Sequence, residues 1–265
     1  MTWLEAVLLG ALEGFTEFLP ISSTGHLILA TRWLGLAGDA VKTFTVVIQA
    51  GALAGILVLY RTEVAAMGRG ALGKDPVGQS LLLKLGLSFV PVAVAGLLFH
   101  HVIKAQLFTP TPVTAALAVG GLLMIAVARR HPAVRRPEPT LDGVTVRDAL
   151  VIGCAQCLAL WPGTSRAMVT LVAGLLLGLP ATVAAEYSFL LAVPTLGAAT
   201  VFDALNGAHA LLQEVGVTGL IGGFAAAAVV AVLAVRGFLR AVTRWGLEPF
   251  GWYRLGLAVL VWAFL

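Results

Sequence analysis

Charged residues are scarce in this chain of 265 residues, and their scarcity excludes the commonest class of protein. Only 11% of the residues are Asp, Glu, Lys or Arg, and 59% are hydrophobic, whereas soluble domains carry roughly 25% charged and about 45–50% apolar residues. Cysteine is also rare. The chain has two cysteines, which are too few for the disulfide framework of a small secreted protein. The composition excludes a water-soluble globule and predicts an integral membrane protein.

A formal charge of +4 does not indicate nucleic-acid binding in this chain. The basic residues lie in short runs between apolar stretches, where Lys and Arg determine how a membrane protein inserts. We therefore predict no nucleic-acid partner. The N-terminus has no basic region before its first apolar stretch, so we expect that stretch to remain in the mature protein.

Ten apolar stretches follow one another, and six are long enough to cross a bilayer, which takes about 20 residues. The predicted spans are residues 40–60, 81–99, 112–128, 183–203, 216–236 and 249–265. The four shorter stretches form pairs, 3–19 with 22–37 and 149–161 with 165–179, each interrupted by a Pro-containing polar turn. Each pair predicts a re-entrant hairpin. Irregular backbone at membrane depth must be buried in protein or line a wet cavity, so the turns indicate a site.

The two hairpins are similar in sequence, which indicates an internal repeat. Gly10–Glu13 followed by Pro20 can be matched, with one gap, to Gly153–Gln156 followed by Pro162. Each half would be one hairpin and three spans, and an odd number of spans inserts the second half upside down. The predicted fold is all-α and integral to the membrane, with six transmembrane helices and two re-entrant helical hairpins in an inverted-topology repeat.

We expect a single membrane domain over residues 1–265. The first repeat would cover residues 1–128, with its hairpin at 3–37, and the second 148–265, with its hairpin at 149–179. Residues 129–147, rich in Arg and Pro, would be a cytoplasmic linker.

Basic residues predict the orientation, because they gather on the cytoplasmic side of membrane proteins. One side carries Arg61, Arg69, Lys74, Arg129, Arg130, Arg135, Arg136, Arg147, Arg236, Arg240 and Arg244, and the other only Arg32, Lys42 and Lys104. Both termini would then lie on the outer face. Arg254, a few residues inside the last span, is expected to snorkel back to the cytoplasmic surface. Gly51 and Gly55 have the spacing that packs spans closely, within one protein or across a homodimer.

Two carboxylates stand at membrane depth in the first hairpin. Glu13 and Glu17 are four residues apart, so a helix places them on one face. Charges inside a membrane cost about 3 kcal/mol or more, and neighbouring like charges repel. A divalent cation is the simplest compensation, since Mg²⁺ is commonly held by one or two carboxylates plus phosphate oxygens. The alternative is that one Glu forms an ion pair or faces water.

After each turn, the next short helix begins with polar side chains. They are Ser22, Ser23, Thr24 and His26 in the first hairpin and Ser165, Arg166 and Thr170 in the second. Helix starts attract anions, and the fork of Arg166 suits phosphate oxygens. N-capping alone would explain the serines but not His26 and Arg166. Hydroxyls, an imidazole, carboxylates and an arginine in one cavity predict phosphoryl transfer.

Two motifs resemble the signatures of the bacterial undecaprenyl-diphosphatase family, also called bacitracin-resistance proteins. They are Glu-Gly-Phe-Thr-Glu-Phe-Leu-Pro-Ile-Ser-Ser-Thr-Gly-His at residues 13–26 and Pro-Gly-Thr-Ser-Arg at 162–166. Lys42–Phe44, Gln49, Gln156 and residues 184–191 extend the resemblance over essentially the whole chain. It implies a multi-pass enzyme of the bacterial inner membrane, its active site facing the periplasm. The enzyme would hydrolyse undecaprenyl diphosphate to undecaprenyl phosphate and phosphate, recycling the lipid carrier for the cell wall and giving bacitracin resistance. A divalent cation, Mg²⁺ or Ca²⁺, would be required.

Position by position, the resemblance implies that Glu13 and Glu17 handle metal or protons and that Arg166 grips the diphosphate. Ser23 is the favoured nucleophile, with His26 or Glu17 as base, and His26 as direct nucleophile stays open. The substrate pocket would be completed by Ser22, Thr24, Gly163, Thr164, Ser165 and Thr170. Two positions depart from the family pattern: Ala167 replaces a serine, and Thr45 stands where an acidic residue is expected.

A polyprenyl-phosphate flippase, with or without phosphatase activity, is the alternative function. Inverted repeats with broken helices are the architecture of secondary transporters. A carrier needs an anion site but no nucleophile beside paired carboxylates, which favours the enzyme. Glu186, a further carboxylate in the fourth span, is expected to support the site without touching the substrate.

Overall fold

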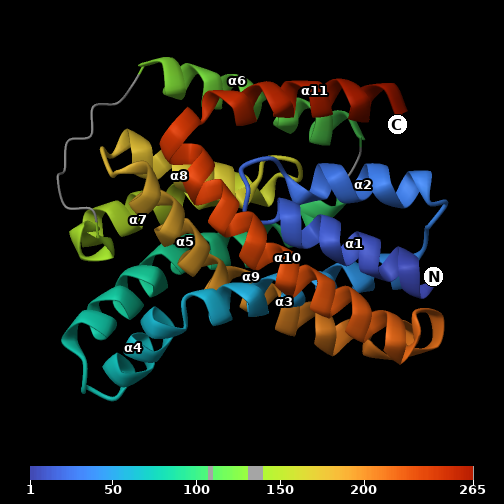
Figure 1. Cartoon of the computed structure of the whole chain (residues 1–265), viewed down its shortest axis with the longest axis horizontal. Coiled ribbons are helices and arrows are strands. Elements are labelled where there is room, and N and C mark those ends of the chain that lie inside the picture. The colour runs from blue at the N-terminus through green and yellow to red at the C-terminus, as the bar shows by residue number, and fades with distance from the viewer. Residues whose placement is uncertain (107–109, 131–139, 265) are drawn as a thin grey trace.

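The structure is a computed structural model that describes residues 1–106, 110–130 and 140–264. Every regular element in these ranges is helical (Figure 1). The elements are α1 (Trp3–Thr16), α2 (Ser23–Trp33), α3 (Asp39–Leu59), α4 (Arg61–Ala71), α5 (Pro76–Gln106), α6 (Pro110–Arg130), η1 (Leu141–Gly143), α7 (Val146–Gln156), η2 (Cys157–Leu160), α8 (Arg166–Leu176), α9 (Ala181–Glu214), α10 (Gly216–Trp245) and α11 (Glu248–Phe264). The all-α class is confirmed. Residues 131–139 of the predicted linker lie outside the described residues.

The two pairs of short helices share their local geometry. Each pair begins with a capping box, Thr2 with Glu5 on α1 and Thr145 with Asp148 on α7. Each second helix has a serine N-cap with a left-handed backbone, Ser22 at φ 72° on α2 and Ser165 at φ 70° on α8. Within the described ranges, these are the only non-glycine residues with positive φ. A left-handed backbone at a residue other than glycine costs about 1–3 kcal/mol. Because both matched serines adopt it, we infer that the site requires this backbone conformation.

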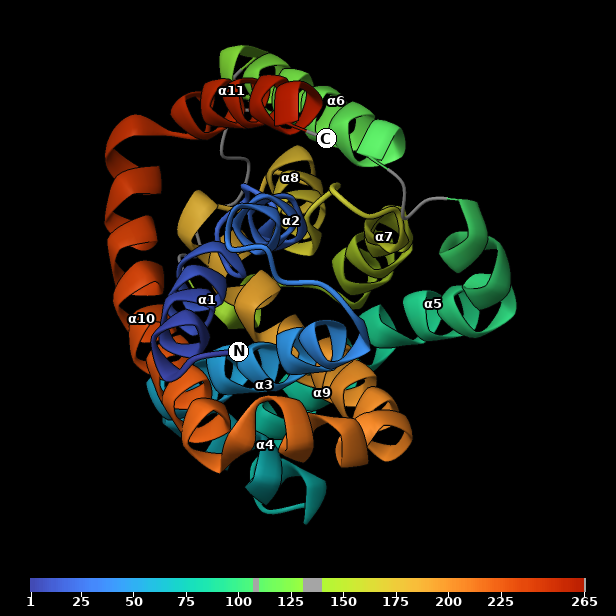
Figure 2. The same cartoon turned by 90° about the vertical axis from the view of Figure 1, so that its right-hand side faces the viewer.

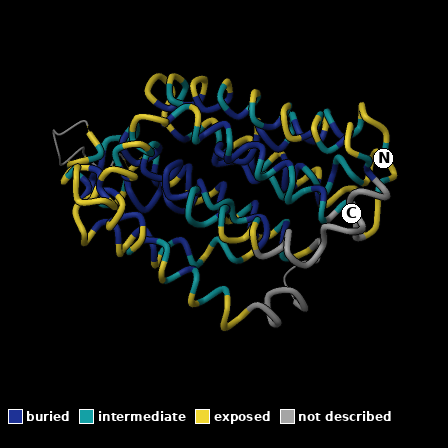
Figure 3. The backbone as a smooth tube through the Cα atoms, turned by 90° about the horizontal axis from the view of Figure 1, so that it is seen from below, coloured by how far each residue is buried: buried dark blue, intermediate teal, exposed yellow. Residues whose placement is uncertain are grey.

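The helices of the two halves pack in corresponding pairs. Helix α1 packs on α10 and α7 packs on α5, while α3 pairs with α9 and α6 with α11. If α1, α3, α5 and α6 are matched to α7, α9, α10 and α11, the α1–α10 contact corresponds to the α7–α5 contact. The α3–α9 and α6–α11 contacts then each join two matched helices. Figure 2 shows α2 and α8 in the interior, covered by α6 and α11 on one side and by α3 and α9 on the other. Buried residues run through this interior (Figure 3).

The helices that are long and apolar enough to cross a bilayer do not by themselves establish the expected six spans. Among the described residues, four helical segments are long and apolar enough to cross a bilayer: Pro76–Phe99, Thr111–Arg130, Ala181–Val201 and Gly216–Trp245. Helices α3 and α4 qualify only together, bent by 83° at their junction. Helix α4 was not predicted, because it holds few large apolar residues and its charged residues are typical of a loop. With 17 residues, α11 is shorter than the usual span. The six-span count, the inverted repeat and its boundaries remain predictions.

Glycines allow α1 and α3 to contact α10 at backbone distance. A Cβ added to Gly10 or Gly14 of α1 would clash with backbone atoms of Gly223 or Ala227. The same holds for Gly51 and Gly55 of α3 against Phe224 and Ala228. Small residues at this spacing let helices approach closely in membranes. The Gly51/Gly55 pair is therefore used within the subunit, and a homodimer stays a prediction.

Gly14→Ala should destabilise the protein, because its methyl group has no room against the α10 backbone. We expect a loss of about 1–3 kcal/mol in the free energy of unfolding, measured as a lower thermal unfolding temperature in detergent. Gly86→Ala on α5 is the matched control, since a Cβ there meets no atom within 4 Å. Equal unfolding temperatures for the two variants would contradict the close contact of α1 and α10.

Candidate active site

One buried carboxylate joins the two hairpins. Glu17, at the C-cap of α1, accepts a hydrogen bond at 2.6 Å from the hydroxyl of Ser23 at the start of α2. Its other oxygen lies 3.5 Å from Nη2 of Arg166 at the start of α8. The side chains of Glu17 and Arg166 are only 7% and 8% exposed. The structure thus brings together three of the predicted site residues, from both halves of the chain.

Arg166 is held firmly but keeps one donor unused. Its Nη1 donates to the carbonyl of Ser188 at 2.9 Å, and the guanidinium carbon lies 5.6 Å from the ring centroid of Phe18. Its Nε is buried and has no hydrogen-bond partner in the described structure. An unsatisfied buried donor costs about 1–3 kcal/mol. Arg166 therefore has an N–H available for an anionic ligand beside Glu17.

Glu13 places a second carboxyl group against Glu17. Its side chain interacts with that of Glu17, and the residue is 1% exposed. Its Oε2 is buried and accepts no hydrogen bond from the described residues. Two adjacent buried carboxylates need a proton or a cation to offset their repulsion.

A divalent cation fits this donor set. The unpaired oxygen of Glu13 and the adjacent Glu17 offer the hard oxygen ligands that Mg²⁺ and Ca²⁺ prefer. No group of three His, Cys, Asp or Glu residues suited to a metal occurs among the described residues. Phosphate oxygens or water would therefore complete the coordination.

His26 is buried beside the cluster but turned toward α11. Its Nδ1 lies 2.7 Å from the carbonyl of Ser22 and must donate to it. Nε2 is then the acceptor for the hydroxyl of Tyr253 on α11, also at 2.7 Å, and the two rings stack with centroids 5.6 Å apart. Both ring nitrogens are engaged, and the side chain that accepts the hydrogen bond of Ser23 is Glu17.

The other predicted pocket residues have varied surroundings. Ser22 and Ser165 cap their helices, accepting hydrogen bonds from the amides of Gly25 and Met168. The Thr170 hydroxyl bonds to the carbonyl of Arg166 and pairs with the hydroxyl of Ser188, so it supports Arg166 from behind. Thr24 is half-buried in the first turn of α2.

The last two pocket residues and Glu186 have other neighbours than the carboxylate cluster. Thr164 lines a separate apolar cavity, and the carbonyl of Gly163 accepts a hydrogen bond from Arg254. Glu186 interacts with Tyr60 and Glu63 near the bend between α3 and α4.

Arg254 does not snorkel to the surface, and that expectation was wrong. The residue is 0% exposed and donates to four backbone carbonyls. These belong to Ala116, Leu117, Pro20 and Gly163. Carbonyls freed by broken helices at membrane depth need protein donors, and a guanidinium offers several. Sequence reasoning also missed Tyr253, although a cation inside a span was a usable signal for this part of α11.

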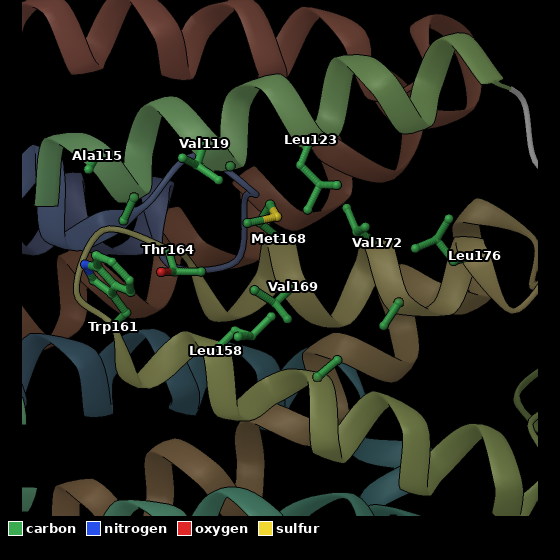
Figure 4. Close-up of a pocket in the computed structure, with 14 residues that line it drawn as sticks. Ala115, Val119, Leu123, Leu158, Trp161, Thr164, Met168, Val169, Val172 and Leu176 are labelled. Atoms are coloured by element: carbon green, nitrogen blue, oxygen red, sulfur yellow. The ribbon is translucent and has the colours of Figure 1, made fainter. Parts of the chain in front are cut away.

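An apolar cavity of about 360 Å³ opens between α6, α7 and α8. Figure 4 shows Met168, Val169, Val172 and Leu176 along α8, with Val119 and Leu123 of α6 across from them. Thr164 and Trp161, from the second break, also line it. The indole of Trp161 donates to the carbonyl of Pro112 at 3.0 Å, which ties the break to α6.

Comparison with known proteins identifies clear relatives. The family described as "Bacitracin resistance protein BacA" matches residues 6–260. A protein named "Undecaprenyl-diphosphatase" from Sorangium cellulosum is 52% identical over 98% of this chain and 86% of its own length. Proteins named "Undecaprenyl-diphosphatase 2" from Shewanella oneidensis and "Undecaprenyl-diphosphatase" from Nitrosomonas europaea are 40% and 43% identical, over 98% of this chain and 97% and 95% of their own lengths.

Tyr253→Phe should release His26. Loss of the hydroxyl leaves Nε2 as a buried acceptor without its donor, which costs about 1–3 kcal/mol of stability. The ¹⁵N chemical shift of His26 Nε2, assigned with a His26→Gln variant, should change. Trp252→Phe on the same helix removes only an exposed bond to Glu248 and should leave that resonance in place. An unchanged His26 resonance in Tyr253→Phe would count against the pairing.

Proposed function

This chain belongs to the bacitracin resistance protein BacA family, and from that premise we propose that it hydrolyses undecaprenyl diphosphate to undecaprenyl phosphate and phosphate. One observation carries the assignment of the site: Ser23 and Arg166, from separate hairpins, both contact the buried Glu17. The relatives named undecaprenyl-diphosphatase, 40–52% identical over 98% of this chain, support the activity. The product would return the lipid carrier to cell-wall synthesis, which accounts for bacitracin resistance.

Ser23 is the proposed nucleophile and Glu17 its base. As the Ser23 oxygen attacks the terminal phosphorus, its proton passes to Glu17 Oε2, which already accepts its hydrogen bond. The bond from that phosphorus to the bridging oxygen breaks, and undecaprenyl phosphate leaves with the electron pair. The protonated Glu17 gives its proton to the departing undecaprenyl phosphate. A water then attacks the phosphoserine and passes a proton to Glu17, the bond from phosphorus to the Ser23 oxygen breaks to release phosphate, and Glu17 returns the proton to Ser23. Arg166 stabilises the charge that develops on the phosphoryl oxygens.

Glu13 and Glu17 are the residues that would hold a divalent cation. When bound, the cation would neutralise phosphate charge and align the diphosphate. Glu13 offers its unpaired Oε2 for this purpose. Ser22 and Ser165 hold the two helix starts, whose amides favour an anion between them.

The proposed location is the bacterial inner membrane, with the site opening to the outer face. The start of α1 and the end of α11 lie at one end of the molecule, and α4 with the α10–α11 junction at the other (Figure 1). The second end carries Arg61, Arg69 and Arg244. The positive-inside rule makes it cytoplasmic.

The apolar cavity between α6, α7 and α8 is the proposed position of the prenyl chain. It is lined almost wholly by carbon, and its lining includes Thr164, two residues before Arg166. Its volume of about 360 Å³ is enough for part of a long chain. The remainder of the chain would extend into the bilayer.

Purified protein in detergent should release phosphate from undecaprenyl diphosphate, and a chelator should abolish the release. Ser23→Ala and Glu17→Gln should each lower kcat about 100-fold or more, because each removes a partner in the proton transfer. Ser80→Ala, an exposed serine on α5, is the control and should retain the wild-type rate. Phosphate release by neither wild type nor variants would refute the hydrolase. Lipid transfer between leaflets without phosphate release would favour the flippase instead.

Val119→Trp should fill the apolar cavity and weaken binding of the prenyl chain. We expect KM for undecaprenyl diphosphate to rise about tenfold, the effect of losing about 1.4 kcal/mol of apolar contact. Hydrolysis of short-chain farnesyl diphosphate should be unaffected. Leu122→Trp is the matched control, because Leu122 is 58% exposed on α6, like Val119 at 65%, but does not line the cavity. Equal effects of both variants, or an unchanged KM in Val119→Trp, would place the chain elsewhere.

A further inference from the structure

Arg254 is a buried cation whose described hydrogen bonds all go to the protein backbone. It donates to Ala116 and Gly163 at 3.0 Å and to Leu117 and Pro20 at 3.3 Å. The four acceptors come from three separate parts of the chain: α6, the first break and the second break. One guanidinium on α11 thus connects both hairpins to the outer layer of α6 and α11.

The two carbonyls at the breaks occupy equivalent positions. Pro20 lies two residues before Ser22, and Gly163 two residues before Ser165, the two serines with the same left-handed backbone. Each carbonyl also lies three residues before a member of the cluster on Glu17: Pro20 before Ser23, and Gly163 before Arg166. The separation of these carbonyls therefore sets where Ser23 and Arg166 stand relative to each other.

The fork of an arginine is required for this arrangement. A guanidinium is planar and presents five donors in fixed directions, whereas a lysine ammonium is a point charge with three. Gly120 on α6 leaves the space that the fork occupies, because a Cβ there would clash with Nη2 of Arg254. Gly120 thus leaves the space in which the guanidinium of Arg254 reaches both breaks, and we call this space the Arg254 socket.

We propose that Arg254 is a positioning residue that holds the two breaks at the separation in which Ser23 and Arg166 share Glu17. It acts through the Pro20 and Gly163 carbonyls and does not touch the substrate. The catalytic consequence rests on the proposed phosphatase function, whereas the backbone consequence does not.

Gly120→Ala tests the socket without changing Arg254. The added methyl group displaces the flexible end of the guanidinium. Amide hydrogen exchange at residues 21–25 and 163–169 should accelerate about tenfold, the effect of losing one charge-assisted hydrogen bond. The value of kcat should fall by about tenfold or more with little change in KM, because a displaced nucleophile slows chemistry more than binding. Gly256→Ala is the control, because Gly256 lies two residues beyond Arg254 and an added Cβ there would meet no atom within 4 Å. It should change neither the amide exchange nor kcat.

Arg254→Lys separates the fork from the charge. It keeps the positive charge but cannot reach all four carbonyls, so we expect the same faster exchange and lower kcat as in Gly120→Ala. Wild-type exchange and kcat in Arg254→Lys would overturn the proposal, since charge alone would then suffice. A lower kcat with unchanged exchange at both breaks would also overturn it, by indicating direct contact with substrate. If Arg254→Lys fails to fold, Gly120→Ala decides. If the wild type releases no phosphate, the phosphatase assignment fails while the exchange measurements still decide the positioning role.

Discussion

Backbone groups freed by a broken helix cannot be left unpaired at membrane depth, and this requirement governs the centre of the molecule. Both hairpins break where the chain must turn, and lipid offers no donor for the exposed carbonyls. Arg254 supplies donors to both breaks at once. The helices that follow the breaks begin at Ser23 and Arg166, and both of these residues contact Glu17. The proposed chemistry thus depends on the way the breaks are satisfied.

The buried charges are nearly balanced before any ligand binds. Glu17 pairs with the guanidinium of Arg166, Glu13 lies against Glu17, and Arg254 is a second buried guanidinium, held by backbone carbonyls. A diphosphate would add negative charge to this balanced set, and uncompensated charge is costly away from water. The proposed cation would restore the balance, which gives a physical reason for a metal requirement in a site that already holds an arginine.

Apolar run length and the two polar turns were sufficient to predict most helices and the members of the central cluster. Glu17, Ser23 and Arg166 could be assigned to one site because all three flank the two breaks, and broken helices at membrane depth gather polar groups around them. The role of Arg254 could not be predicted, since its acceptors lie as far away in sequence as Pro20. Helix α4 was missed because a helix with few large apolar residues and several charges has the composition of a loop. His26 likewise depends on Tyr253, a partner that only tertiary packing selects.

The glycine contacts of α1 and α3 with α10 restrict how the molecule can move. Backbone lies against backbone at Gly10, Gly14, Gly51 and Gly55, so sliding α1 along α10 would drive side chains into the opposing main chain. Alternating-access carriers depend on such relative displacement of their halves. Here the close contacts of Gly10 and Gly14 with α10 oppose such a displacement of the first hairpin.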